Sequence, residues 1–177
     1  QEGENSIGGG TAILNTTEGT LTLDNVAVTS HIWISGSPLT VSVKGNSSVG
    51  SQESPSSEVA LWNNTDLTIQ IEQGATLSLY TEGSNNVYTF GGSLTVSGPG
   101  KLIGNSVSGG NGAFPNLCAT NDITLNDNLT AELFSEWHGV YTEKGNIAVQ
   151  SSAVTINAAG IGLFAQTYDP DTDSQIP

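Results

Sequence analysis

The sequence predicts an all-β chain wound as a single-stranded, right-handed parallel β-helix of about seven short coils, with loops inserted at its corners. Three observations favour this fold: an apolar alternation of period two along the chain, a repeat of 21 to 30 residues, and no amphipathic helical pattern. Gly, Ser, Thr and Asn are abundant and only 11% of residues are charged, a composition suited to strands and turns.

Each repeat opens with a short apolar segment and continues with one or two longer strands. The short segments begin at Ile32, Val59, Val87, Leu117, Val140 and Ile161, at spacings of 27, 28, 30, 23 and 21 residues. The longer strands are 21–23, 39–43, 67–71, 94–96, 123–125 and 147–149, with second strands at 75–79, 129–131 and 153–156. Since alternate strand residues face opposite sides, the predicted core is Leu21, Leu39, Val59, Leu61, Leu67, Ile69, Leu94, Val96, Ile123, Leu125, Ile147 and Val149.

An antiparallel β-sandwich is the alternative fold. It expects strands at even spacing, joined by hairpin turns such as Asn-Gly or Asp-Gly. Apart from a single Asn111-Gly112, neither dipeptide occurs in the chain, and the repeat is uneven, with the longest gaps expected as loops at one corner. Antiparallel pairing of strands 67–71 and 75–79 would contradict the β-helix.

The charge balance excludes several partners. The chain has 17 acidic residues against 3 lysines and no arginine, a formal net charge of −14. Phosphate recognition needs clustered Lys and Arg, so we expect no nucleic-acid partner and no binding to an anionic membrane surface. No apolar run is long enough for membrane insertion. The chain has no Met, from which we expect a fragment of a longer, secreted or cell-surface protein.

Enzyme motifs of other β-helices are mostly missing. Asn64-Thr65-Asp66 matches the first motif of polygalacturonases, but the later Asp-Asp, Gly-His-Gly and Arg-Ile-Lys motifs do not occur. Pectate-lyase chemistry generally uses an Arg, which the chain lacks. His31 and His138 are the only histidines, and the single Cys118 has no recognisable catalytic partner. We therefore predict no catalytic residue and disfavour a polysaccharide lyase or hydrolase.

One coil carries a resemblance. Residues 139–149, Gly-Val-Tyr-Thr-Glu-Lys-Gly-Asn-Ile-Ala-Val, continued by 153–161, resemble the coil of a bacterial family of secreted parallel β-helix domains usually labelled carbohydrate-binding. The resemblance implies a bacterial, extracellular binding domain. That family tends to carry Asp in the turn before its Gly-Ile step, where calcium can bind. This chain departs from the pattern, with Asn85-Asn86, Asn116, His138 and Gly160 at those positions.

The C-terminal residues hold the only calcium-like pattern. Asp169, Asp171 and Asp173 alternate as calcium ligands do, although Ser174 stands where a calcium loop has Gly. An acidic tail or linker over 168–177, at the end of a single 1–177 domain, is the other interpretation. We expect no cofactor besides this candidate calcium.

The aromatic residues provide the functional hypothesis. If Ile32, Ile34, Val59 and Leu61 point inwards, then His31, Trp33, Ala60 and Trp62 point outwards, as do Tyr88, Phe90, Tyr141 and Phe164. Stacked coils would space these rings by about 4.8 Å, close to the repeat of a sugar chain. The sequence thus predicts a carbohydrate-binding or adhesion module that binds a polysaccharide or cell-surface glycan through Trp33, Trp62, Tyr88, Phe90 and Tyr141. The alternatives are that loops cover these rings, and that the chain is a structural stalk or scaffold without its own ligand.

The last repeat opens with 161–165 and lacks the Thr-rich strand of the others. An open apolar layer there predicts either further coils or end-to-end self-association.

Overall fold

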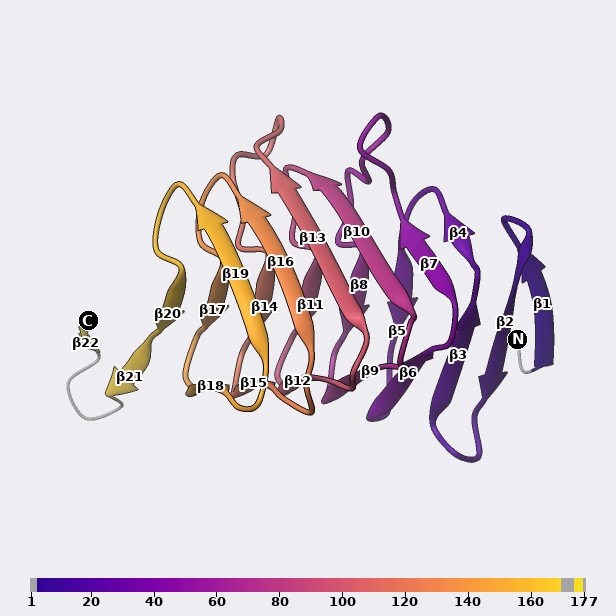
Figure 1. The fold of residues 1–177 in the computed structure, drawn as a ribbon. Coiled ribbons are helices and arrows are strands. Elements are labelled where there is room, and N and C mark those ends of the chain that lie inside the picture. The colour runs from indigo at the N-terminus through magenta and orange to yellow at the C-terminus, as the bar shows by residue number, and fades with distance from the viewer. Residues whose placement is uncertain (1–2, 170–173, 177) are drawn as a thin grey trace.

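The computed structural model describes residues 3–169 and 174–176, and these contain strands and no helix. Three sheets, here called A, B and C, stack their strands side by side to form a parallel β-solenoid (Figure 1). Sheets B and C have six strands each, separated by five steps, so the solenoid makes about five turns. The count of seven coils is not confirmed, and the right-handed sense stays a prediction.

The strands follow the order A, B, C in every turn. Sheet A contains β1 (Gly3–Ile7), β2 (Gly10–Asn15), β3 (Thr20–Asp24), β6 (Leu39–Val43), β9 (Leu67–Ile71), β12 (Leu94–Ser97), β15 (Ile123–Leu125) and β18 (Ile147–Val149). Sheet B contains β4 (Ala27–Val28), β7 (Asn46–Val49), β10 (Thr76–Glu82), β13 (Lys101–Val107), β16 (Thr130–Ser135) and β19 (Ala153–Ala158). Sheet C contains β5 (Ile32–Ile34), β8 (Leu61–Asn63), β11 (Val87–Thr89), β14 (Leu117–Ala119), β17 (Val140–Thr142) and β20 (Leu163–Ala165). The short strands β21 (Thr167–Asp169) and β22 (Ser174–Ile176) pair with each other.

Strand pairing decides between the two folds considered from the sequence. The strands β9 and β10 lie in different sheets, and each pairs in parallel with strands of the turns before and after it. The parallel solenoid is thus confirmed and the antiparallel sandwich is excluded for the main body of the chain.

At the N-terminal end, the sequence predicted β3, as strand 21–23, but not β1 or β2. The strands β1, β2 and β3 form an antiparallel meander at the end of sheet A. Gly8 and Gly9 connect β1 to β2 with φ angles of 58° and 88°. A two-residue hairpin with positive φ at both positions favours Gly-Gly as well as Asn-Gly, so this turn had a sequence signal.

The core is one apolar column enclosed by the three sheets. Eight of the predicted residues are buried there: Leu39, Leu61, Leu67, Ile69, Leu94, Val96, Ile123 and Leu125. Leu21 and Ile147 are half-buried and pack against the column.

Three sequence predictions about burial are wrong. Val59 is only half-buried and Ala60, expected outside, is fully buried, because β8 begins at Leu61 and both residues belong to the preceding loop. Val149 is 41% exposed, because β18 is the last strand of sheet A and no further strand of the described residues covers it.

Length variation is concentrated at one corner. Residues 50–60 connect β7 to β8 and residues 108–116 connect β13 to β14, and both loops project from the corner between sheets B and C (Figure 1). In the second loop Gly109 and Gly112 each donate a backbone hydrogen bond to the other, at 3.0 and 2.9 Å. The corner therefore absorbs insertions without breaking the strand ladders.

Candidate functional site

The outward side chains of sheet C form one row along the solenoid. The central residues of its six strands are in register with one another: Trp33, Trp62, Tyr88, Cys118, Tyr141 and Phe164. Five of the six are aromatic, and we call this set the aromatic row. The sequence predicted the aromatic members from period-two alternation but did not place Cys118 among them.

Short strands with a fixed pattern hold the row in place. In β8, β11 and β17 the first and third residues are buried and the second is half-buried on the outer face. The buried third residue is polar: Asn63 Nδ2 donates to the carbonyl of Asp66 at 2.9 Å, and Thr142 Oγ1 donates to the carbonyl of Gly145 at 2.8 Å. Thr89 Oγ1 bonds Gly92 in the same way, at 3.1 Å. These bonds tie each strand to its following turn and so fix which residue faces outwards.

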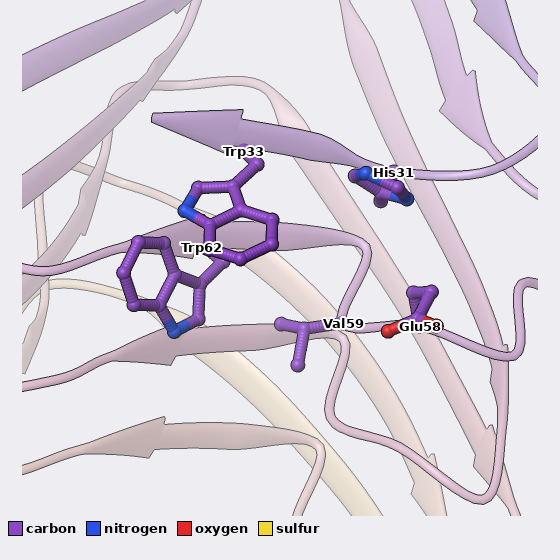
Figure 2. A pocket seen from close by; sticks show the side chains of 5 residues that line it. All are labelled: His31, Trp33, Glu58, Val59 and Trp62. Atoms are coloured by element: carbon purple, nitrogen blue, oxygen red, sulfur yellow. The ribbon is translucent and has the colours of Figure 1, made fainter. Parts of the chain in front are cut away.

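The first two rings of the row line an open cleft of about 380 Å³. Figure 2 shows Trp33 and Trp62 projecting from neighbouring strands, with His31 and Glu58 to one side of them and Val59 between. The two indoles meet edge to face with their centroids 4.9 Å apart. Trp33 is 68% exposed, which makes it the most accessible large apolar side chain in the described residues.

The middle of the row is more polar. The hydroxyl groups of Tyr88 and Thr120 both donate to the Glu143 carboxylate, at 3.1 Å each. Burial, reinforced by Glu143, raises the pKa of Tyr88 and raises that of the Cys118 thiol to about 12. Cys118 therefore stays a protonated thiol at neutral pH and is not an activated nucleophile. Phe90 follows β11 rather than lying in it, and its exposed ring lies 6.3 Å from that of Tyr88.

A second aromatic cluster ends the row. Tyr141 and Phe164 have ring centroids 5.5 Å apart, and Tyr141 donates to Gln166 Oε1 at 2.5 Å. Trp137 stacks on His138 at 4.1 Å and lies 6.3 Å from Tyr141, so it also belongs to this face. The alternation of strand residues does not place Trp137, because it lies in the turn between β16 and β17.

The corner loops leave the row partly accessible. Trp33 and Phe90 are well exposed, whereas Trp62, Tyr88, Tyr141 and Phe164 are half-buried. Ring-to-ring contacts along the row contribute to this burial.

The two places where calcium was considered have different outcomes. Asp169 ends β21, while Asp171 and Asp173 lie outside the described residues, so that prediction stays open. The turn positions highlighted by the resemblance hold Asn86, Asn116 and His138, which are buried and linked by backbone hydrogen bonds of 3.0 Å. Among the residues that the structure describes, no group of three or more His, Cys, Asp or Glu side chains converges on a metal position.

The polygalacturonase-like tripeptide has a structural role. Asp66 Oδ1 accepts the backbone N–H of Ser93 at 2.8 Å, and Asn64 Oδ1 accepts that of Gly36 at 2.8 Å. Asp122 bonds the N–H of Asn146 in the same way at 2.7 Å, although it lies outside any such tripeptide. These side chains link the turns of successive coils.

Comparisons with protein-family models, with curated proteins and with solved structures return no match to this chain. None of the described residues belongs to a helix capable of crossing a membrane.

Proposed function

We propose that the protein is an extracellular carbohydrate-binding or adhesion module and that the aromatic row is its glycan site. The observation that carries the proposal is the register of five aromatic side chains along sheet C, beginning at the exposed Trp33 and interrupted once, by Cys118. Aromatic faces offer apolar area at low entropic cost and suit the C–H faces of sugar rings.

The spacing of the row suits a linear glycan. Neighbouring strands lie about 4.8 Å apart, which is close to the length of one sugar unit in an extended chain. A polysaccharide lying parallel to the solenoid axis would thus meet the rings of Trp33, Trp62 and Tyr88 in succession and, beyond Cys118, those of Tyr141 and Phe164. Glu58 and His31 beside the Trp33–Trp62 cleft, and Glu143 beside Tyr88, supply hydrogen-bonding groups for sugar hydroxyls.

The charge of the protein narrows the ligand class. With a formal net charge of −14 and no arginine, the chain repels uronates and sulfated sugars. The proposed ligand is therefore a neutral polysaccharide or a neutral cell-surface glycan. The protein that binds it is proposed to be bacterial and either secreted or attached to the cell surface. The proposal assigns no catalytic residue.

A structural stalk is the second candidate. The observation that favours it is the edge-to-face contact of Trp33 with Trp62 and the packing of Tyr141 on Phe164, which also stabilise the outer face of sheet C without a ligand. On this alternative the aromatic row contributes to stability and binds nothing.

Affinity gel electrophoresis with soluble xylan, glucomannan and laminarin separates the two candidates. We expect retardation by at least one neutral glycan, and a loss of affinity of about tenfold or more in Trp33→Ala and in Trp33→Ala/Trp62→Ala. Trp33→Ala is the more informative variant because the side chain is largely exposed, so we expect the fold to tolerate its removal. Ile13→Ala, an exposed apolar residue of β2, is the matched control.

Polygalacturonate serves as the charged comparison in the same gels. Absence of retardation by every neutral glycan, or equal retardation of the wild type and Trp33→Ala, would contradict the proposal and favour the stalk. Reproducible glycan turnover, abolished by Asp66→Asn, would contradict the non-enzymatic assignment.

A further inference from the structure

Sheet B has an outward row of its own that no part of the proposed function uses. Four side chains on neighbouring strands β10, β13, β16 and β19 are in register: Tyr80, Asn105, Phe134 and Asn157. Aromatic and amide side chains alternate along this row. The four strands that carry the row lie side by side at the front of Figure 1.

The row lies in a groove of about 410 Å³. Gln52, from the loop between β7 and β8, lines one part of it, and Glu132 and Thr155 from the adjacent outward row line another. Phe134 is 36% exposed and Tyr80 is half-buried. The groove thus combines two aromatic surfaces with amide, hydroxyl and carboxylate groups, as small-molecule sites generally do.

One amide in the groove is incompletely satisfied. The Oδ1 atom of Asn105 is buried without a hydrogen-bond partner among the described residues. Buried side-chain oxygens normally accept a hydrogen bond. Because the terminal torsion of an Asn side chain is soft, the Asn105 amide can turn so that its Oδ1 accepts a hydrogen bond from a ligand hydroxyl.

The charges favour an uncharged ligand. Lys101 and Glu132 pair at 2.8 Å across neighbouring strands of the same face, so the lysine does not offer a free cationic contact. A phosphate, sulfate or uronate would therefore lack a positive partner here.

We propose that this groove is a second carbohydrate site, for a neutral glycan with an extended two-fold chain such as a β-1,4-linked glucan or mannan. In such a chain alternate sugar rings turn the same way. Tyr80 and Phe134 lie two strands apart, about 9.6 Å, and would stack on every second ring, while Asn105 and Asn157 bond the rings between them. The inference does not rest on the aromatic row, because the two sites lie on different sheets.

The test uses the full chain and titration calorimetry with cellohexaose and mannohexaose. In the Trp33→Ala/Trp62→Ala background, which weakens the aromatic row, we expect the remaining binding to fall about tenfold on adding Phe134→Ala, and to fall about as much with Tyr80→Ala. Asn157→Ala, an exposed position, gives a fold-neutral version of the same test, and Ile13→Ala is again the control.

The outcomes separate the two sites. Residual binding that survives all of the sheet B substitutions, or no residual binding in the Trp33→Ala/Trp62→Ala background, overturns the second site and leaves the aromatic row standing. Binding that is lost with Phe134→Ala in the wild-type background and unaffected by Trp33→Ala supports the sheet B groove and contradicts the aromatic row. Absence of any binding by the wild-type chain overturns both.

Discussion

Gly104 shows how one residue makes room for another inside the solenoid. It lies on the inward face of β13, between Leu79 and Leu133 of the neighbouring strands. A Cβ at this position would lie 2.2 Å from Oδ1 of Asn116, a fully buried residue whose amide nitrogen donates to the carbonyl of Phe134 at 2.8 Å. Position 104 therefore requires glycine, because the side chain of Asn116 occupies the space beside β13 that a Cβ would need.

We predict that Gly104→Ala destabilises the protein by about 1–3 kcal/mol, since an added methyl in a packed interior displaces its neighbours. For a chain of this size the melting temperature should fall by roughly 3–10 °C, measured by circular dichroism. Gly110→Ala is the control, because nothing lies within 4 Å of its added Cβ and its φ is ordinary. Equal melting temperatures for Gly104→Ala and the wild type would show that Asn116 relaxes freely.

Among the elements, the sequence predicts the longer strands best. The alternation over 67–71 and 94–96 indicated β9 and β12, because apolar and polar residues alternate there without interruption and the inward face of each strand is fully apolar. It did not indicate β13, whose inward residues are Leu102, Gly104 and Ser106 and so break the apolar pattern.

The two candidate surfaces were predictable to different degrees. The aromatic row follows from alternation, because each ring lies in a short strand whose repeat recurs along the chain. The sheet B row was missed because its residues lie beyond the apolar part of each strand: the predicted strand 129–131 continues to Ser135 in β16 and so includes Phe134. Its register also depends on turn lengths that the sequence does not determine.

The turn between β16 and β17 has a pH-sensitive bond. His138 is 8% exposed, and its Nδ1 accepts the backbone N–H of Ile161 at 3.0 Å, which connects this turn to the last coil. Burial lowers the pKa of His138 below its ordinary value of 6.5. The unfolded chain therefore takes up this proton at a higher pH than the folded chain.

It follows that the contribution of neutral His138 to stability is fully present above pH 6.5 and is lost as the pH falls through the lower, folded pKa. We predict that the wild type loses more stability between pH 7 and pH 5 than His138→Gln does, measured as the midpoint of urea unfolding. The carboxylates affect the urea midpoint of the wild type and of His138→Gln equally, so the difference between the two pH profiles reports His138 alone. The control His31→Gln changes an exposed histidine, and its pH profile should match that of the wild type. Parallel pH profiles for the wild type and His138→Gln would contradict the assignment.

At the scale of the whole molecule, the three sheets share one core, and apolar side chains become exposed at the last coil. At the last coil the edge strands are β18, β19 and β20. Val149, Ile161 and Leu163 are exposed there by 41%, 47% and 48%, unlike the buried residues in the middle of the stack. Unpaired strand edges beside apolar side chains favour the addition of further strands.

We therefore predict that this chain self-associates through its last coil, and that Leu163→Lys weakens the association because a lysine on an apolar edge carries its charge into the contact. Size-exclusion chromatography with light scattering over a range of concentrations measures it: the apparent mass of the wild type should rise with concentration, while Leu163→Lys stays monomeric. Ile13→Lys, exposed on β2 and distant in the stacking order, is the matched control and should behave as the wild type. A wild type that remains monomeric throughout, or a Leu163→Lys variant that associates equally, would show that this end is already covered.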